Sequence, residues 1–361
     1  MNIISRCRLM AVMVICVLTV GITHAGAADK ITFKNKNVSM IIGYRAGGST
    51  DVMARIVAPY LAKYLPGSPT IVPRNILGAG GVKALNYFWQ QSKPDGLTVN
   101  AGSGTQVDPL TYRRAHAVYD TRKLRIFGGT GRAGTVMVVR KEVFGRLTDK
   151  SQPPLIMAGR DAIRSGMMMA MWGAEYLGWN IRWVLGYRGS ADILLALQRK
   201  EADMTSLSSM QEISSLMKTG NFALITQSGA LDHGKLVARS EYDAPVIYNI
   251  VKDRITDART RRAFDYWKTL TLPGQWFALP PATPDIIVAL YRKAYAAAER
   301  DPGFKVRVQK IAADTIFMSV ADTENLIRSL AETDNDTLEV IAEIQRKQGI
   351  MRSKKRKRSK H

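Results

Sequence analysis

Cysteine is almost absent from this chain of 361 residues, and its two cysteines stand near the N-terminus. Cys7 and Cys16 both lie in or beside one short apolar segment, so the rest of the chain has no thiol. This excludes a disulfide scaffold, a thiolate nucleophile and a cysteine metal site in the main body of the protein. A body without cysteine suits an exported protein that folds without disulfide chemistry.

Histidine and the common cofactor motifs are also scarce. Between the two ends only His116 and His233 occur, without the spacing of metal ligands. The chain has no phosphate-binding P-loop, and residues 102–107 start like a dinucleotide fingerprint but lack its third glycine. A hydrolytic triad can be drawn from Ser103, His116 and Asp108, although no nucleophile-elbow motif surrounds the serine. The sequence predicts no metal and no cofactor, and a secreted α/β hydrolase or lyase acting on a carboxylate stays open as an alternative to a binding protein.

Long apolar runs are missing as well. The run at residues 9–22 has 14 residues and no later run is as long, whereas a membrane-spanning helix needs about 20 apolar residues. It follows two arginines and precedes a group of small residues, which is the layout of a secretory signal peptide. A membrane anchor fits this segment less well. We therefore expect residues 1–28 to be a signal peptide, cleaved near Ala27 or Ala28, and the mature protein to reach the periplasm.

Positive charge is abundant, with a formal net charge of +22. Nine of these charges lie at the two ends, two in the N-terminal segment and seven in residues 352–361, which leaves +13 for the body. Lys354 to Arg358 form an unbroken basic run of the kind found in nucleic-acid patches. The run contains no aromatic residues for base stacking, and blocks of like charge are usually disordered. We expect a solvated, disordered tail at 352–361, and no nucleic acid as a partner.

Strand and helix patterns alternate along the body. Short apolar runs predict strands at residues 38–42, 70–72, 98–101, 124–127, 135–139, 154–158, 181–185 and 222–226. Apolar residues at helical spacing follow Asp51, with Ser49 or Thr50 as the cap. Similar stripes predict a helix after Thr283 and one last long helix capped by Asp322 or Thr323. This alternation indicates an α/β fold with largely parallel sheets, and a body of about 320 residues favours two lobes.

The segment after the first predicted strand carries the clearest chemistry. Two glycines, Gly47 and Gly48, let the backbone approach a ligand closely. Ser49, Thr50 and Asp51 then open a helix, whose free N-terminal amides and dipole favour an anion. An ordinary tight turn between a strand and a helix would have the same residues, so both interpretations stay open at this point.

Five segments, taken in order, resemble the receptor family of the tripartite tricarboxylate transporters. They are Tyr44-Arg-Ala-Gly-Gly-Ser-Thr-Asp51 with Arg55, Asn75-Ile-Leu-Gly-Ala-Gly-Gly81, Lys93-Pro-Asp-Gly-Leu-Thr98, Tyr187-Arg-Gly-Ser-Ala191 and Trp276-Phe-Ala-Leu-Pro-Pro-Ala-Thr-Pro284. Each segment is a weak signal alone, but together they span most of the mature chain. The resemblance implies a type II periplasmic-binding fold, with two α/β lobes closing on a small carboxylate in a hinge cleft.

The resemblance also implies lobe boundaries and ligand contacts. Lobe one would comprise residues 29–125 plus 245–351, and lobe two residues 126–244. The implied ligand-binding residues are Tyr44, Arg45, Gly47, Gly48, Ser49, Thr50, Asp51, Ser103, Gly104 and Thr105 in lobe one, with Ser165, Gly166, Arg188, Gly189, Ser190 and Ser208 in lobe two. Ordinary turn and capping chemistry would also explain each of them. The family implies a monomer that is not an enzyme and that delivers a small carboxylate to integral membrane permease subunits.

Three features depart from the family pattern. Arg45 stands where the family commonly has an apolar or small residue, which adds a positive charge to the first loop. Methionines crowd residues 167–171, as adaptable core filler or as the wall of a broader pocket. Asp192 adds a negative charge beside the loop at Arg188. These features bear on which carboxylate is bound more than on the fold.

Overall fold

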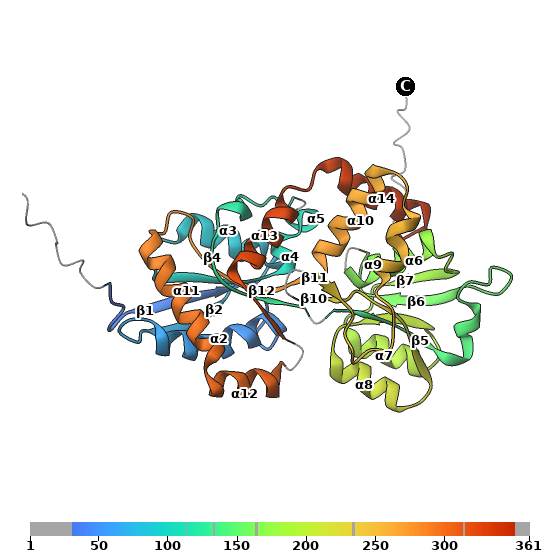
Figure 1. The fold of residues 1–361 in the computed structure, drawn as a ribbon, viewed down its shortest axis with the longest axis horizontal. Helices are drawn as coiled ribbons and strands as arrows, with labels where there is room; N and C mark the ends of the chain where they lie inside the picture. Colours follow the sequence, from blue (N-terminus) through green and yellow to red (C-terminus); the bar gives the residue numbers. More distant parts are fainter. Residues whose placement is uncertain are drawn as a thin grey trace, which may run out of the picture.

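The computed structural model describes residues 31–350 except 114, 133, 163–164, 233–234 and 313–314. The predicted signal peptide and the predicted basic tail lie outside the described residues. Figure 1 shows two α/β lobes side by side, each built around its own sheet. No helix within the described residues is both long and apolar enough to cross a membrane.

The first lobe is built on a six-stranded sheet with the order β13-β4-β12-β3-β1-β2. Its strands are β1 (Asn37–Ile42), β2 (Thr70–Asn75), β3 (Thr98–Ser103), β4 (Arg125–Gly131), β12 (Pro273–Leu279) and β13 (Ile316–Met318). Strand β1 pairs in parallel with β2 and β3, whereas β12 lies antiparallel between β3 and β4. The side chains of Val38, Met40 and Ile42 are fully buried, as expected for a strand inside a sheet covered on both faces.

The second lobe is built on a five-stranded sheet with the order β7-β6-β8-β5-β9. Its strands are β5 (Val136–Arg140), β6 (Leu155–Gly159), β7 (Ile181–Leu185), β8 (Met204–Leu207) and β9 (Phe222–Gln227), and a separate ribbon pairs β10 (Ala230–Asp232) with β11 (Lys235–Val237). The sheets are thus mixed, with β5 and β12 running against their neighbours. All eight predicted strands are confirmed, although β2 and β4 extend three and four residues beyond their predicted ends, and β8, β10, β11, β12 and β13 were not predicted as strands.

Helices cover both sheets. They are α2 (Ser49–Tyr64), α3 (Val82–Gln91), α4 (Gly104–Val107), α5 (Pro109–Tyr112), α6 (Ser165–Tyr176), α7 (Ser190–Gln198), α8 (Met210–Lys218), α9 (Ile247–Val251), α10 (Ala258–Leu270), α11 (Asp285–Arg300), α12 (Pro302–Ile311), α13 (Val320–Ala331) and α14 (Asn335–Lys347). One apolar core packs α2 and α11 on the first sheet, a second packs α7 and α8 on the second sheet, and the largest runs from α3 through α10 to α6. The two lobes therefore share a continuous apolar core.

Several predicted helix ends were wrong. The N-cap of α2 is Gly48, with no side-chain cap, so neither Ser49 nor Thr50 caps it. The N-cap of α13 is Ser319, whose hydroxyl accepts from the Asp322 amide. The predicted last long helix is two helices, because the chain turns at Asp334, whose carboxylate caps α14. This turn carries the chain from the first sheet, where α13 packs on β4, to α10 and α6, where α14 packs.

The chain changes sheet twice between strands. It passes from the first sheet to the second between Gly131 and Val136, and returns between Gln227 and Pro273. The amide of Arg132 donates to the carbonyl of Leu272 at 2.9 Å, so the two crossing segments are joined by a hydrogen bond. The lobe boundaries proposed from the sequence, at 125/126 and 244/245, stay predictions.

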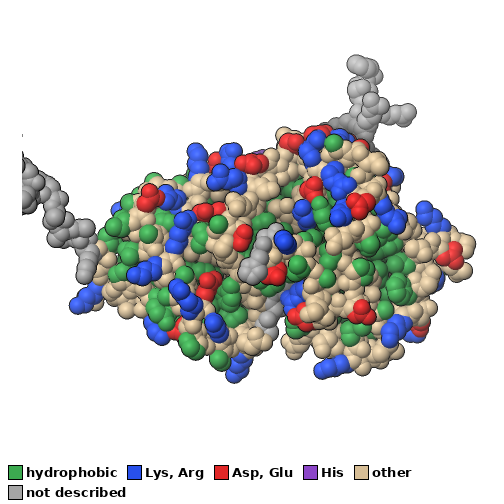
Figure 2. All heavy atoms as spheres, viewed as in Figure 1, with side chains coloured by type: hydrophobic (Ala, Val, Ile, Leu, Met, Phe, Trp, Pro, Cys, Tyr) green, Lys and Arg blue, Asp and Glu red, His purple; other side chains and the backbone are tan. Residues whose placement is uncertain are grey.

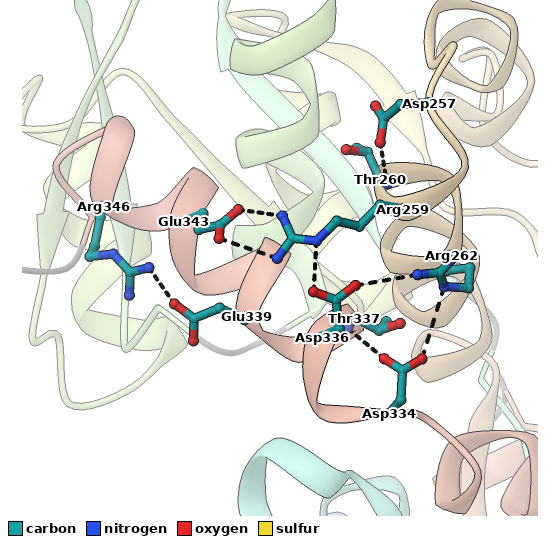
Figure 3. Close-up of polar contacts among 10 residues, drawn as sticks. All are labelled: Asp257, Arg259, Thr260, Arg262, Asp334, Asp336, Thr337, Glu339, Glu343 and Arg346. Atoms are coloured by element: carbon teal, nitrogen blue, oxygen red, sulfur yellow. Dashed lines mark hydrogen bonds and ion pairs between the residues drawn. The ribbon is translucent and has the colours of Figure 1, made fainter.

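Ion pairs fasten α14 to α10, as Figure 3 shows. Arg259 of α10 pairs with Asp336 and Glu343 of α14, each at 2.7 Å, and Arg262 donates to Asp336 at 3.3 Å. These charges are half-exposed, so each pair contributes little alone, but several charges form one network. On its other side α14 donates from the buried Gln345 amide to the carbonyl of Ala162 at 2.8 Å.

We expect Gly102→Ala to destabilise the protein. A Cβ at Gly102 would lie 2.1 Å from the ring of Trp276, which is fully buried and donates to the Ser103 carbonyl. Either the indole or strand β3 must move, at a cost of about 3 kcal/mol, the upper end for an overpacked core. Urea unfolding measures this free energy. Gly145→Ala is the matched control, since a Cβ at this position would meet no heavy atom within 4 Å, and equal losses for both variants would contradict the packing argument.

Candidate functional site

A cavity of about 270 Å³ lies between the two lobes. Its wall combines the start of α4 in the first lobe, the crossing segment after β4, and three strand–helix loops of the second lobe. The lining residues are Gly104, Thr105, Asp108, Thr111, Arg132, Thr135, Ala158, Gly159, Arg160, Asp161, Ser165, Gly166, Met167, Ser190, Ile193, Thr205, Ser206, Leu207, Ser208 and Leu270. Ligands of open α/β sheets bind at such places, beyond the carboxyl ends of the strands.

The first-lobe wall is held by hydrogen bonds around Ser103 and Tyr44. Ser103 caps α4 in a capping box with Gln106, and its hydroxyl donates to the Tyr44 hydroxyl at 2.6 Å. Tyr44 in turn donates to the carbonyl of Gly80 at 2.8 Å. These bonds tie the loops after β1, β2 and β3 together, so Gly104 and Thr105 present the start of α4 to the cavity from a fixed frame.

Asp51 braces the first loop from inside. Its side chain is buried, and its carboxylate accepts from the Gly47 amide and Arg55 Nε, both at 2.9 Å, and from Asn75 Nδ2 at 2.8 Å. The hydrogen bond from Arg55, aided by the Asn75 amide and the Gly47 N–H against the effect of burial, lowers the pKa of Asp51 to about 2. The carboxylate therefore stays ionised at neutral pH and occupies the loop amide that was expected to face a ligand.

The remaining predicted residues of the first loop lie at the surface or inside the loop. Arg45, Gly47 and Ser49 are exposed, Gly48 is half-buried and Thr50 is buried. None of the residues from Tyr44 to Asp51 lines the cavity.

In the second lobe the structure brings Ser165, Gly166, Ser190 and Ser208 together around the cavity. The Ser190 hydroxyl donates to Glu212 at 2.6 Å, and those of Ser208 and Thr135 are 2.9 Å apart. A Cβ at Gly166 would lie 2.2 Å from the hydroxyl oxygen of Ser206, so a glycine is needed for this close approach.

The other two predicted residues of the second lobe stand apart from the cavity. Arg188 is exposed and Gly189 is half-buried, and neither lines it. The methionines at 167–171 are buried, as predicted for core filler, and of these Met167 reaches the cavity wall.

The charged residues of the cavity were not predicted as ligand contacts. Arg132 lies on the crossing segment, with its guanidinium close above Gly104, where a Cβ would come within 3.3 Å of Nη2. Arg160 and Asp161 lie on the loop after β6. Asp108 is buried and accepts from the Tyr266 hydroxyl at 2.6 Å, and burial together with this carboxylate raises the pKa of Tyr266, so the phenol stays a donor. The local sequence signal for Asp108 was the proline that follows it, but an aspartate before a proline indicates a helix cap as readily as a ligand contact.

The structure does not assemble the hydrolytic triad that the sequence left open, Ser103, His116 and Asp108. Ser103 bonds to Tyr44 and Gln106, and Asp108 to Tyr266, while no hydrogen bond joins the exposed His116 to either residue. Within the part of the chain that the structure describes, no three His, Cys, Asp or Glu side chains lie close enough to hold a metal ion.

Comparisons with known proteins agree with this two-lobed arrangement. No family model matches the chain. It is 27% identical over 289 residues to a UPF0065 protein of Bordetella pertussis, covering 78% of this chain and 81% of that one. It is 40% identical over 98 residues to the protein BugT of the same organism, covering 27% of this chain and 28% of the relative.

Three solved structures share the fold. A TctC solute-binding protein from Polaromonas superposes with a TM-score of 0.63 at 15% identity, covering 86% of this chain and 98% of that chain. The periplasmic binding protein BugD has a TM-score of 0.56 at 18% identity, over 87% and 98%. MatC from Rhodopseudomonas palustris, solved with bound malate, has a TM-score of 0.56 at 16% identity, over 84% and 98%.

The two sheets and the cavity between the lobes match the two-lobed fold of the periplasmic binding proteins. The sequence relatives and these neighbours agree with the receptor family of the tripartite tricarboxylate transporters, which the five sequence segments resemble.

We expect the Asp51 brace to give the protein a specific acid sensitivity. Because the folded pKa of about 2 lies below the ordinary aspartate value of 3.8, the stabilisation is complete well above pH 4 and is lost as the pH falls towards 2. Asp51→Asn should therefore lower the urea midpoint at pH 7, and its difference from the parent should shrink between pH 4 and pH 2. A difference that stays constant down to pH 2 would rule out ionisation of Asp51 as its cause.

Proposed function

We propose that this protein is an exported receptor that captures a small carboxylate in the interlobe cavity and delivers it to membrane permease subunits. The observation that carries the proposal is a polar cavity of about 270 Å³ whose wall comes from both lobes and from the segment that joins them. A cavity made by two lobes opens and closes when the lobes move about their crossing segments. The malate bound in the structural neighbour MatC supports a carboxylate as the ligand class.

The wall supplies suitable donors for such an anion. Ser165, Ser206 and Ser208 offer hydroxyls from the second lobe, and the start of α4 offers backbone amides from the first. Arg132 supplies a guanidinium, whose charge-assisted hydrogen bonds to a carboxylate are stronger than neutral ones. Binding of this kind needs no bond making, and the chemistry of the wall requires no cofactor.

The acids in the wall restrict how a ligand lies. Asp108 and Asp161 would repel a carboxylate placed beside them, whereas Arg132 and Arg160 would attract it. An anion is therefore favoured between Arg132 and the serines, and a hydroxyl or ammonium group of the same ligand would be accepted beside the aspartates. A hydroxylated or amino-substituted carboxylate fits this division.

Localisation and partners follow from the same proposal. A signal peptide at residues 1–28 would take the chain to the periplasm, where a permease of the tripartite tricarboxylate type would accept the ligand from a monomeric receptor. The Lys and Arg side chains of the visible face are spread over both lobes rather than gathered into one stripe (Figure 2), which favours a solute receptor over a nucleic-acid-binding protein.

The test is a binding measurement on the purified protein. We expect a dose-dependent thermal shift and a heat of binding with malate or a related dicarboxylate, because a ligand of the native state stabilises it. Arg132→Gln should weaken binding about tenfold or more, as expected for the loss of a charge-assisted hydrogen bond. Arg307→Gln is the matched control, since Arg307 is exposed on α12 outside the cavity.

Two further measurements separate the outcomes. Urea unfolding without ligand shows whether Arg132→Gln acts through stability, because Arg132 also contacts other groups of the protein. Arg188→Gln tests the predicted loop: a loss confined to this variant would move the ligand from the cavity to the outer loops. Absence of any shift or heat across di- and tricarboxylates, amino acids and aromatic acids would contradict the carboxylate receptor.

A further inference from the structure

A second, strongly basic cavity lies in the first lobe, away from the interlobe cleft. This cavity has a volume of about 480 Å³ and lies at the start of strand β4, around Arg125. The opposite end of β4, at Gly131, leads into the crossing segment beside the interlobe cavity. It is formed by the 3-10 turn η3 (Thr121–Lys123), the start of β4, and the helices α11 and α13, which both pack on β4 (Figure 1). We call it the basic pocket, and it shares no lining residue with the interlobe cavity.

Five cationic side chains and one acid line the basic pocket. The cations are Arg122, Lys123, Arg125, Arg292 and Arg328, and the acid is Glu324. They come from η3, β4, α11 and α13, so sequence-distant segments converge on one cavity. Like charges brought together in this way repel one another unless an anion lies among them.

Three of the cations are held in place by other groups. Arg122 donates to both carboxylate oxygens of Asp120, each at 2.9 Å, and Arg125 pairs with Asp285. Arg292 donates to Glu324 at 2.7 Å and to the carbonyl of Ile126 at 3.0 Å.

The other two cations, Lys123 and Arg328, have N–H donors that no protein group accepts from among the described residues. No hydrogen bond or ion pair joins the side chains of Lys123 and Arg328 to any other described residue. They come from η3 and α13, which pack against each other.

A buried hydroxyl supplies an independent observation. Thr121 lines the basic pocket and is 4% exposed, and its Oγ1 has no hydrogen-bond partner among the described residues. Buried polar groups are almost always paired, and an unpaired one is destabilising. A ligand oxygen in the pocket would give this hydroxyl its missing partner.

We propose that the basic pocket binds a phosphate group. Its free donors are an ammonium, a guanidinium and a hydroxyl on separate elements, and they suit an anion with oxygens on several sides. Guanidinium groups bind phosphate bidentately, and an ammonium adds a point charge. A planar carboxylate offers two oxygens and would leave some of these donors unused. The site is independent of the proposed carboxylate receptor, because it uses none of its residues.

Two sources could supply the phosphate, and they differ in chemistry. Inorganic phosphate is a free ion with four oxygens, whereas a phospholipid headgroup presents a phosphodiester. The probes are therefore inorganic phosphate and glycerophosphoglycerol, the deacylated headgroup of phosphatidylglycerol. Titration calorimetry and ³¹P NMR of the full chain measure binding of each probe. Tighter binding of glycerophosphoglycerol would indicate that a lipid surface supplies the phosphate. Tighter binding of inorganic phosphate would indicate a soluble ligand.

Paired variants test the site itself. We expect Lys123→Gln with Arg328→Gln to lower the affinity for the preferred probe at least about tenfold, and Thr121→Val to lower it about tenfold without changing charge, as for hydrogen bonds to a charged group. The double variant Lys305→Gln with Arg307→Gln removes the same two charges from α12, where both are exposed, and should leave binding unchanged. Carboxylate binding in the interlobe cavity should be unaffected by all these variants.

Three results would overturn the proposal. One is the absence of binding of either probe to the parent chain. The second is an equal loss in the α12 control, which would assign the effect to net charge. The third is unchanged binding in both Thr121→Val and the Lys123/Arg328 double variant, which would place the phosphate elsewhere, for example in the interlobe cavity.

Discussion

The hydrogen bond from the Arg132 amide to the Leu272 carbonyl joins the two segments by which the chain passes between its sheets. One segment leads from β4 to β5, and the other returns from α10 to β12. The two segments therefore lie side by side where the lobes meet, next to the cavity that both lobes line. The same segment that makes this bond also carries the Arg132 side chain into the cavity. The position of this arginine in the cavity wall is therefore set by the short stretch of chain that joins the two sheets.

The two walls of the cavity differ in how firmly they are held. In the first lobe Asp51, Tyr44 and Ser103 tie three loops into one hydrogen-bonded frame. In the second lobe the wall consists of serines on separate strand–helix loops, one of which is held from outside by Gln345 of α14. Since α14 is also fastened to α10 by ion pairs (Figure 3), it connects α10 with the second-lobe loop that contains Ala162.

The basic pocket and the interlobe cavity differ in the balance of positive and negative side chains in their walls. The interlobe cavity is lined by two arginines and two aspartates, so the formal charges of its wall balance. In the basic pocket cations outnumber the single acid, and two of them lack partners among the described residues. The excess positive charge of the body is thus partly concentrated at a defined place and partly spread over the visible surface of both lobes.

The sequence by itself determined the α/β class and the strands with continuous apolar runs, because burial on both faces leaves a local pattern. Strand β12 escaped this pattern, since it opens with Pro273 and Gly274, which indicate a turn, and it is a strand because Trp276 packs over Gly102. The sequence also indicated Ser165, Gly166, Ser190 and Ser208 as loop residues, and the structure places them in the cavity wall. Only the tertiary structure decided which polar groups line a cavity. Asp51 was expected to bind one but is satisfied by Arg55 and Asn75, while Arg132 and Thr121 meet their cavities through neighbours distant in the chain. Such pairings depend on long-range geometry, which no local pattern of residues records.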